Sequence, residues 1–295
     1  MTQAPLYGCI EAGGTKFVVG LARDENSVLD QVRIATTTPG ETIGQAIAWL
    51  KEAQARHGVP RAIGIASFGP LELDRSAPNW GHITATTKPG WNDTDFAGSI
   101  GRALALPVAL DTDVNGAALA EARWGAGRGQ RISVYITVGT GIGGGAIVAG
   151  QTLRGLSHPE MGHFHPKRHE DDHAFSGICP FHGDCLEGLA SGPAIKARWG
   201  ASLSELAADH PAHEIIAWYL AQLVITLQSF MEPGRIIIGG GVSGTPGLLD
   251  RVRNRAEALG SAYFRGKAAE IVVSPGLGDR AGLMGALALA QDIVS

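Results

Sequence analysis

Two cysteines and a histidine lie close together in the sequence and could bind a metal ion. They are Cys179, His182 and Cys185, which have the spacing C-x2-H-x2-C. Thiolate sulfur and imidazole nitrogen are ligands of tetrahedral zinc in structural sites. The alternatives are a small disulfide loop, or two reduced cysteines beside a surface histidine. The chain has only three cysteines, an odd number that is typical of a reducing cytoplasm and disfavours the disulfide. We therefore predict a zinc site.

A four-coordinate zinc site needs one more ligand, and several histidines precede the cluster. The spacing does not choose among these candidates, which are His158, His163, His165, His169 and His173. Four protein ligands would leave no open position for a substrate. The predicted zinc is therefore structural, and it would organise a loop region.

Asp111 and Asp113 are candidates for acid–base chemistry. They follow an apolar segment, 107–110, and precede a helical pattern. Ligands of open α/β sheets gather at the carboxyl ends of strands, which is where these two aspartates are expected. Asp111 could simply be the N-cap of the helix. Because one cap is enough, the other aspartate is available as a general base.

Two glutamates lie on either side of the cysteine–histidine cluster. Glu160 is part of the segment Pro-Glu-Met-Gly-His, and Glu187 follows the second cysteine of the cluster. Carboxylates are good acceptors for the hydroxyl groups of a sugar. The alternative for each is a solvated surface acid.

Two glycine loops could bind phosphate groups. The first spans Glu11 to Lys16 and the second spans Thr137 to Gly145, each directly after an apolar run. Glycine allows sharp turns and close approach, so that several backbone N–H groups can converge on an anion. Two such loops predict a polyphosphate held from two sides. The alternative for either loop is a tight structural turn.

The second loop also fits G-x-G-x-x-G, the pattern of dinucleotide-binding sites. That pattern requires a helix after the loop. Here a short apolar segment, 146–149, follows and ends at a glycine. This indicates a returning strand, and hence a hairpin.

The elements that position these residues alternate between strands and helices. Strands are predicted at 6–10, 16–22, 30–35, 62–67, 107–110, 132–138, 145–149, 235–238 and 271–274. Helices are predicted at 41–57, 94–104, 114–124, 212–230, 248–258 and 280–293. The order indicates an α/β protein with an approximate duplication of topology. The long irregular stretch 151–192 is typical of a functional segment.

Composition excludes several classes of protein. The chain has 295 residues, of which 44% are hydrophobic, and a formal net charge of -4. No basic block predicts nucleic-acid binding. We expect no membrane span, because no apolar stretch approaches the roughly 20 residues that are required. Residues 1–6 lack the features of a signal peptide.

Together these residues resemble the ROK family of bacterial sugar kinases and repressors, nearly from end to end. The similarity is greatest to the zinc-containing fructokinases of that family, which begin with a loop similar to residues 10–16. The family pattern of Glu-x-Gly-His before a cysteine-rich loop and a following Cys-x-Glu is matched by Glu160, His163, the cluster and Glu187.

The resemblance implies an ATP-dependent kinase of a hexose, with fructose favoured, that uses ATP and Mg²⁺. It makes His163 the fourth zinc ligand and Asp113 the catalytic base. It makes Thr112, Glu160 and Glu187 sugar contacts. ATP would contact Gly13, Gly14, Thr15, Lys16, Thr140, Gly141, Gly239 and Gly240.

The resemblance also implies an actin-like, ribonuclease H-like fold with two α/β domains around a central ligand cleft. We predict one domain from residues 1–111 plus 281–295, and the other from residues 112–280 with the zinc loop. It further implies a cytoplasmic homodimer.

Three departures from the commoner family pattern favour the fructokinase branch over a glucokinase. They are Glu11 where many members have aspartate, Thr112 where many have asparagine, and the C-x2-H-x2-C loop. Mannokinase, glucokinase and N-acetylmannosamine kinase remain alternatives. A sugar-responsive repressor would need a DNA-binding segment before residue 11, for which we expect no room. A non-catalytic sugar-binding protein would need neither two phosphate loops nor Asp113.

Overall fold

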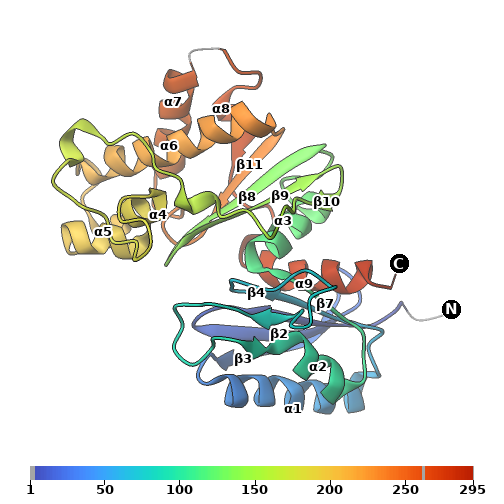
Figure 1. Ribbon diagram of the computed structural model, residues 1–295. Coiled ribbons are helices and arrows are strands. Elements are labelled where there is room, and N and C mark those ends of the chain that lie inside the picture. The colour runs from blue at the N-terminus through green and yellow to red at the C-terminus, as the bar shows by residue number, and fades with distance from the viewer. Residues whose placement is uncertain (1–3, 261–262, 295) are drawn as a thin grey trace. The chain divides into compact units, whose positions relative to one another are not determined.

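The chain forms two five-stranded sheets in the computed structural model, which describes residues 4–260 and 263–294 (Figure 1). The first sheet has the order β3-β2-β1-β4-β7. Its strands are β1 (Tyr7–Ala12), β2 (Lys16–Ala22), β3 (Val28–Ala35), β4 (Ile63–Ser67) and β7 (Val108–Thr112). The buried strands β1, β2 and β4 are nearly continuous apolar runs, as expected for a sheet covered on both faces. A short hairpin of β5 (His82–Ile83) and β6 (Thr94–Asp95) lies outside this sheet.

Helices cover both faces of the first sheet (Figure 1). They are α1 (Pro39–His57), α2 (Phe96–Leu104), α3 (Asp113–Trp124) and α9 (Ala281–Asp292). Helix α1 begins two residues before the predicted start, because the Thr38 side chain accepts a hydrogen bond from the Glu41 N–H, as an N-cap does. Helix α9 comes from the end of the chain, yet it packs on β1 and β4.

Glycines let helix α9 approach its neighbours closely. A Cβ on Gly64 of β4 would overlap the carbonyl oxygen of Ala286. A Cβ on Gly285 would overlap the backbone of Gly116 in α3. The backbones of α3 and α9 therefore touch at this glycine pair, one turn along from the residues that begin α3.

The second sheet has the order β10-β9-β8-β11-β12. Its strands are β8 (Ile132–Val138), β9 (Ile142–Val148), β10 (Gln151–Thr152), β11 (Arg235–Gly239) and β12 (Val272–Val273). The associated helices are α4 (Leu186–Ala190), α5 (Gly192–Trp199), α6 (Ala212–Met231), α7 (Leu248–Gly260) and α8 (Ala268–Ile271). Helix α6 is buried along most of its length and packs against α7 and α4.

The two sheets have the same topology, which confirms the predicted duplication. In each, an antiparallel hairpin is followed by two strands that pair in parallel. The hairpins are β1–β2 and β8–β9. The parallel additions are β4 and β7 in one sheet, and β11 and β12 in the other.

The hairpin at the second glycine loop is also confirmed, but the loop is shorter than predicted. Strand β9 begins at Ile142, so that only residues 139–141 form the turn. Gly144 lies within the strand, and a Cβ there would come 2.6 Å from the Met161 sulfur. The run of glycines therefore reflects close packing of another segment on β9 as well as a turn.

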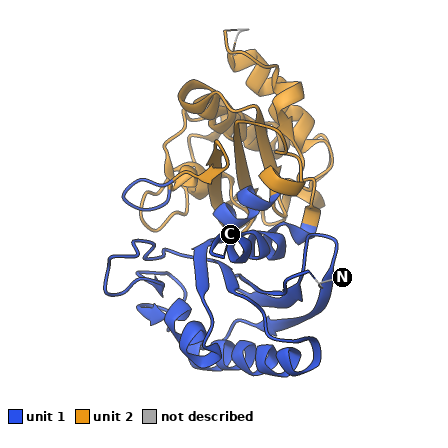
Figure 2. Cartoon of the chain, turned by 90° about the vertical axis from the view of Figure 1, so that its right-hand side faces the viewer, with its two compact units in different colours: residues 1–120, 154–158, 279–295 blue, residues 121–153, 159–278 orange. Residues whose placement is uncertain are grey.

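The chain divides into two compact units (Figure 2). The first contains the chain up to Ala120, Arg154–His158 and the residues from Asp279 onward. The second contains Glu121–Leu153 and Pro159–Gly278. These limits differ from the predicted domain boundaries at 111 and 281, because most of α3 and the segment 154–158 group with the first sheet.

The expectation that no apolar stretch approaches 20 residues is wrong for helix α6. Helix α6 has 20 residues and a mean hydropathy of 1.3 over its most apolar window, which is enough by length and composition to cross a membrane. In the sequence, the apolar residues of α6 recur at helical spacing with polar residues between them, so that they do not form one continuous apolar stretch. In the structure, 56% of that window is buried, and α6 lies in the core of the second unit.

Candidate active site and metal site

The carboxyl end of β7 and the first turn of α3 carry the predicted acid–base residues. Asp111 is fully buried, and its Oδ1 atom accepts hydrogen bonds from the Thr112 N–H at 2.8 Å and from Asn115 Nδ2 at 2.7 Å. The Thr112 hydroxyl accepts from the Asn115 N–H at 3.1 Å. Thr112, and not Asp111, therefore caps the helix, because its hydroxyl accepts from the N–H of the third residue of α3, as an N-cap side chain does.

Arg154 binds the buried Asp111 and was missed by sequence reasoning. Its Nη2 atom lies 2.6 Å from Asp111 Oδ2, and its side chain remains 43% exposed. A buried carboxylate needs such a partner, because an isolated buried charge is unstable. The local sequence around Arg154, Leu-Arg-Gly, does not indicate this ion pair, because Arg154 and Asp111 are 43 residues apart in the chain.

Asp113 remains the better candidate for a general base. It is the first residue of α3 and is half-buried. Its Oδ1 atom accepts from the Val114 N–H at 2.9 Å. Asp111 is fully buried and bonds to Arg154, to the Thr112 N–H and to Asn115, which indicates a structural role. Asp113 lies nearer to the surface, where a substrate could reach it.

The first glycine turn joins β1 to β2 in the first unit. Gly14, Thr15 and Lys16 are exposed, and the Gly13 N–H donates to the Lys16 carbonyl. Burial raises the pKa of Glu11, at the end of β1, against the opposing effect of Lys16. The exposed backbone of the turn is suited to contact an anion.

The second glycine turn, residues 139–141, lies in the second unit beside the end of β11. The Val242 N–H donates to the Val138 carbonyl at 2.9 Å. Gly240 has a φ of 90°, and a Cβ there would come 2.5 Å from the Val138 oxygen. Only glycine fits this position, whatever the ligand. Thr140 is exposed and Gly141 is half-buried.

Four cysteine and histidine side chains converge into a group that could hold a metal ion, which we call the Cys/His cluster: His163, Cys179, His182 and Cys185. One ligand atom from each lies within 4.8 Å of all the others. Nδ1 of His163 is 3.8 Å from the Cys179 sulfur and 3.5 Å from the Cys185 sulfur. The histidine that the resemblance implied is therefore the one that the fold brings to the cysteines. His165 lies nearby, with Nε2 3.3 Å from the His182 carbonyl, but is not part of the cluster.

The surroundings of the Cys/His cluster fit a tetrahedral cation. Its donor set is two sulfurs and two imidazole nitrogens, which zinc prefers. The second ring nitrogen of His163, Nε2, lies 3.9 Å from Glu187 Oε1. A carboxylate behind a metal-binding imidazole is the usual support for such a ligand. Burial, chiefly, raises the pKa of the Cys185 thiol to about 11, so that metal binding there is coupled to loss of a proton.

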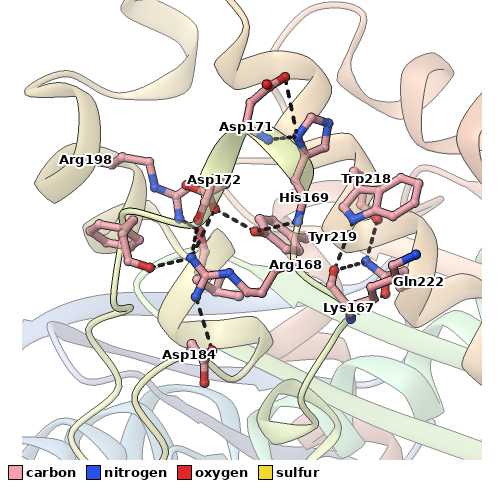
Figure 3. Close-up of polar contacts among 12 residues, drawn as sticks. Lys167, Arg168, His169, Asp171, Asp172, Asp184, Arg198, Trp218, Tyr219 and Gln222 are labelled. Atoms are coloured by element: carbon pink, nitrogen blue, oxygen red, sulfur yellow. Dashed lines mark hydrogen bonds and ion pairs between the residues drawn. The ribbon is translucent and has the colours of Figure 1, made fainter.

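A network of buried charges, drawn in Figure 3, anchors the segment that leads to the cluster. Asp172 is buried and lies 3.0 Å from Arg198 Nη1. It also accepts a 2.6 Å hydrogen bond from the Tyr219 hydroxyl, whose pKa is raised by burial and by this bond. Arg168 contacts the Asp172 carbonyl and reaches Asp184 at 3.1 Å. This anchor needs no metal, and sequence reasoning missed it because no local pattern links its members.

Comparison with known proteins identifies the family. A model of the ROK family matches residues 7–293. The chain belongs to the ROK family. A fructokinase from Zymomonas mobilis is 52% identical over 97% of this chain and 96% of its own length. The fold is the actin-like fold of ROK sugar kinases.

Two solved structures of ROK kinases match nearly the whole chain. A ROK hexokinase from Thermus thermophilus has a TM-score of 0.80 and 29% identity, over 98% of this chain and 99% of that one. A ROK glucokinase from Streptomyces griseus, in complex with glucose and AMPPNP, has a TM-score of 0.76 and 26% identity, over 97% and 99%.

Proposed function

We propose that this ROK protein transfers the terminal phosphoryl group of ATP to a hexose, with D-fructose as the preferred acceptor and fructose 6-phosphate as the product. The observation that carries the proposal is the 52% identity to a fructokinase over 97% of the chain. The ROK glucokinase bound to glucose and AMPPNP is far less similar, at 26% identity. This difference favours fructose over glucose.

Asp113 is the proposed general base. It takes the proton from the attacking sugar hydroxyl as the oxygen–phosphorus bond to the sugar forms and the bond to ADP breaks. Its place at the start of α3, beside the fixed Asp111–Arg154 pair, gives it a rigid support. Mg²⁺ bound to the ATP phosphates supplies positive charge to the transferring group.

The proposed ATP contacts come from both glycine turns and from the end of β11. They are the residues that the family resemblance implies: Gly13, Gly14, Thr15, Lys16, Thr140, Gly141, Gly239 and Gly240. Backbone N–H groups in such turns stabilise phosphate oxygens. The proposed sugar contacts are Thr112, Glu160 and Glu187. Glu160 is exposed, which agrees with a ligand-facing carboxylate, and Glu187 is half-buried.

The Cys/His cluster is the proposed zinc site. Zinc held by four protein ligands has no open position, so that it supplies cross-linking and no chemistry at the sugar. The three cysteines are not joined in disulfides, in agreement with a cytoplasmic location. We propose a homodimer as the working form, on the family resemblance alone.

We expect one zinc per chain in protein purified without chelator, measured by elemental analysis. Cys179→Ser is expected to lose most of the metal, because a four-ligand site loses affinity steeply when one ligand is removed. His165→Ala is the matched control, since this histidine lies beside the cluster but outside it, and should retain the metal. Metal-free protein with a Cys179–Cys185 disulfide would contradict the prediction.

The substrate is tested by kcat/KM for fructose, mannose, glucose and N-acetylmannosamine with saturating Mg-ATP, in a coupled assay of ADP release. Fructose is expected to lead by about ten-fold or more, because a site built around the hydroxyl groups of one sugar leaves buried polar groups unpaired when another sugar binds. The same panel run with Asp113→Asn measures any contaminating kinase. A different leading sugar would overturn the fructose assignment and leave the kinase assignment intact.

A further inference from the structure

The turn at residues 139–141 and the start of β9 lie between two segments that carry ligands of the Cys/His cluster. One is the single helical turn Met161–His163, which packs on β9. A Cβ on Gly162 would overlap the Ile142 carbonyl, and one on Gly144 would come 2.6 Å from the Met161 sulfur. His163, the next residue, is a ligand of the cluster.

The other segment is α4, which begins directly after the ligand Cys185. The Ile142 N–H donates to Glu187 Oε2 at 2.9 Å. A Cβ on Gly141 would come 2.7 Å from the same oxygen. Farther along, the Gly192 N–H donates to the Gly139 carbonyl at 2.8 Å. Both ends of the turn are thus bonded to the segment that follows the cluster.

The side chains of His163 and Glu187 connect these two segments to each other. Nδ1 of His163 faces the cysteines of the cluster, and Nε2 lies 3.9 Å from Glu187 Oε1. The other oxygen of Glu187 holds the Ile142 N–H. A short chain of contacts therefore runs from the metal ligands through one carboxylate to the backbone of the second glycine turn.

We propose that the metal in the Cys/His cluster holds the second glycine turn in the shape that binds the phosphates of ATP. The metal cross-links the segments on either side of the turn, and without it Glu187 and Met161–His163 lose their fixed spacing. The inference rests on the proposed function, because it takes this turn as a nucleotide contact. It adds to Glu187 the role of a positioning residue for the turn.

The unit is expected to remain folded when the metal is removed. The Asp172–Arg198–Tyr219 network anchors the segment between His163 and Cys179 without a metal (Figure 3). Leu186, next to the ligand Cys185, is buried in the apolar core around α6, which also holds α4 in place. Removal of the metal should therefore loosen only the contacts of Glu187 and Met161–His163 with the second glycine turn. The metal-free protein can then be compared directly with the zinc-loaded protein.

The test compares full-length protein as purified, after removal of the metal with a chelator, and after reloading with zinc. Calorimetry with Mg-AMPPNP, in the absence of sugar, is expected to show affinity about 5- to 150-fold weaker without zinc and restored on reloading, which is the usual range for coupling between sites. Reciprocity requires AMPPNP to strengthen zinc binding by the same factor, measured by competition with a chelator. Hydrogen exchange should speed up at residues 139–142 and stay unchanged in β8.

Gly162→Ala tests the same contact with the metal in place. Its Cβ must push the Ile142 carbonyl away, so that AMPPNP affinity should fall by about five-fold or more even at full zinc content. Gly155→Ala is the matched control, because a Cβ there meets nothing within 4 Å. If Gly162→Ala does not fold, the chelator experiment stands on its own.

Equal affinity for AMPPNP in the zinc-loaded and zinc-free proteins, with unchanged exchange at 139–142, would overturn the inference and leave the proposed kinase intact. Failure of even the zinc-loaded protein to bind AMPPNP would overturn the nucleotide assignment, and the inference with it.

Discussion

Asp113→Asn is expected to lower kcat by about 10²- to 10⁴-fold, which is the usual effect of removing a general base. Asparagine has nearly the same shape as aspartate and can still accept the Val114 N–H bond, so that the first turn of α3 should persist. It cannot take a proton from a sugar hydroxyl. KM for the sugar should change little, because the base acts in the transition state and not in binding.

Asp111→Asn is the comparison that separates catalysis from folding. This change removes the ionic partner of the half-exposed Arg154 and weakens the hydrogen bonds at the buried position 111, and should lower the free energy of unfolding by about 1–3 kcal/mol. Asp113→Asn should unfold at the same denaturant concentration as the unchanged protein. A kcat within a few-fold of the original would show that Asp113 is not the base.

Gly285→Ala is expected to destabilise the first unit by about 1–2 kcal/mol or more. Two effects oppose each other at this position. Alanine is better than glycine inside a helix by about 1 kcal/mol. Its Cβ would, however, overlap the backbone of Gly116, which cannot move aside by a side-chain rotation. Overpacking of this kind typically costs 1–3 kcal/mol and more against backbone, so the steric effect should dominate.

Gly44→Ala is the matched control for Gly285→Ala. Gly44 also lies within a helix, α1, but a Cβ there meets nothing within 4 Å. It should therefore stabilise the protein by about 0.5–1 kcal/mol. Chemical denaturation of both variants measures the difference. If Gly285→Ala is as stable as Gly44→Ala, the contact between α3 and α9 is looser than described. Because Asp113 begins α3, kcat should also fall in Gly285→Ala and not in Gly44→Ala.

Much of the fold could be predicted because its signals are local. Apolar runs beside glycines gave the strands, and the segment after Gly145 gave the hairpin of β8 and β9. The limits of the second turn were misjudged because glycine in a sequence does not distinguish a turn from close packing. Position 144 is occupied by glycine because a Cβ there would overlap the side chain of Met161, which lies 17 positions later in the sequence. Only the folded structure brings these two residues together.

The residues of the Cys/His cluster could be predicted from the sequence, but the residues that hold the candidate sites in place could not. The spacing of Cys179, His182 and Cys185 gave three members of the cluster, and the resemblance gave His163. Arg154 and the Asp172 network came only from the structure, since each joins residues that are distant in the chain. The alternative that Asp111 is the cap of α3 could not be decided from the sequence because aspartate and threonine are both good caps, and only the hydrogen bond from the Asn115 N–H to the Thr112 hydroxyl decides between them.

Helix α9 also sets the order in which the chain can fold during synthesis. Residues 121–278, which contain the whole second unit, are synthesised between the first sheet and α9. The first sheet emerges earliest, yet the face of β1 and β4 that α9 covers must wait for the last helix. The first unit is therefore expected to complete its folding no earlier than the second, against the usual order of domains along a nascent chain. Until α9 has been made, the first unit would expose an apolar strand face, which is the kind of surface that chaperones hold.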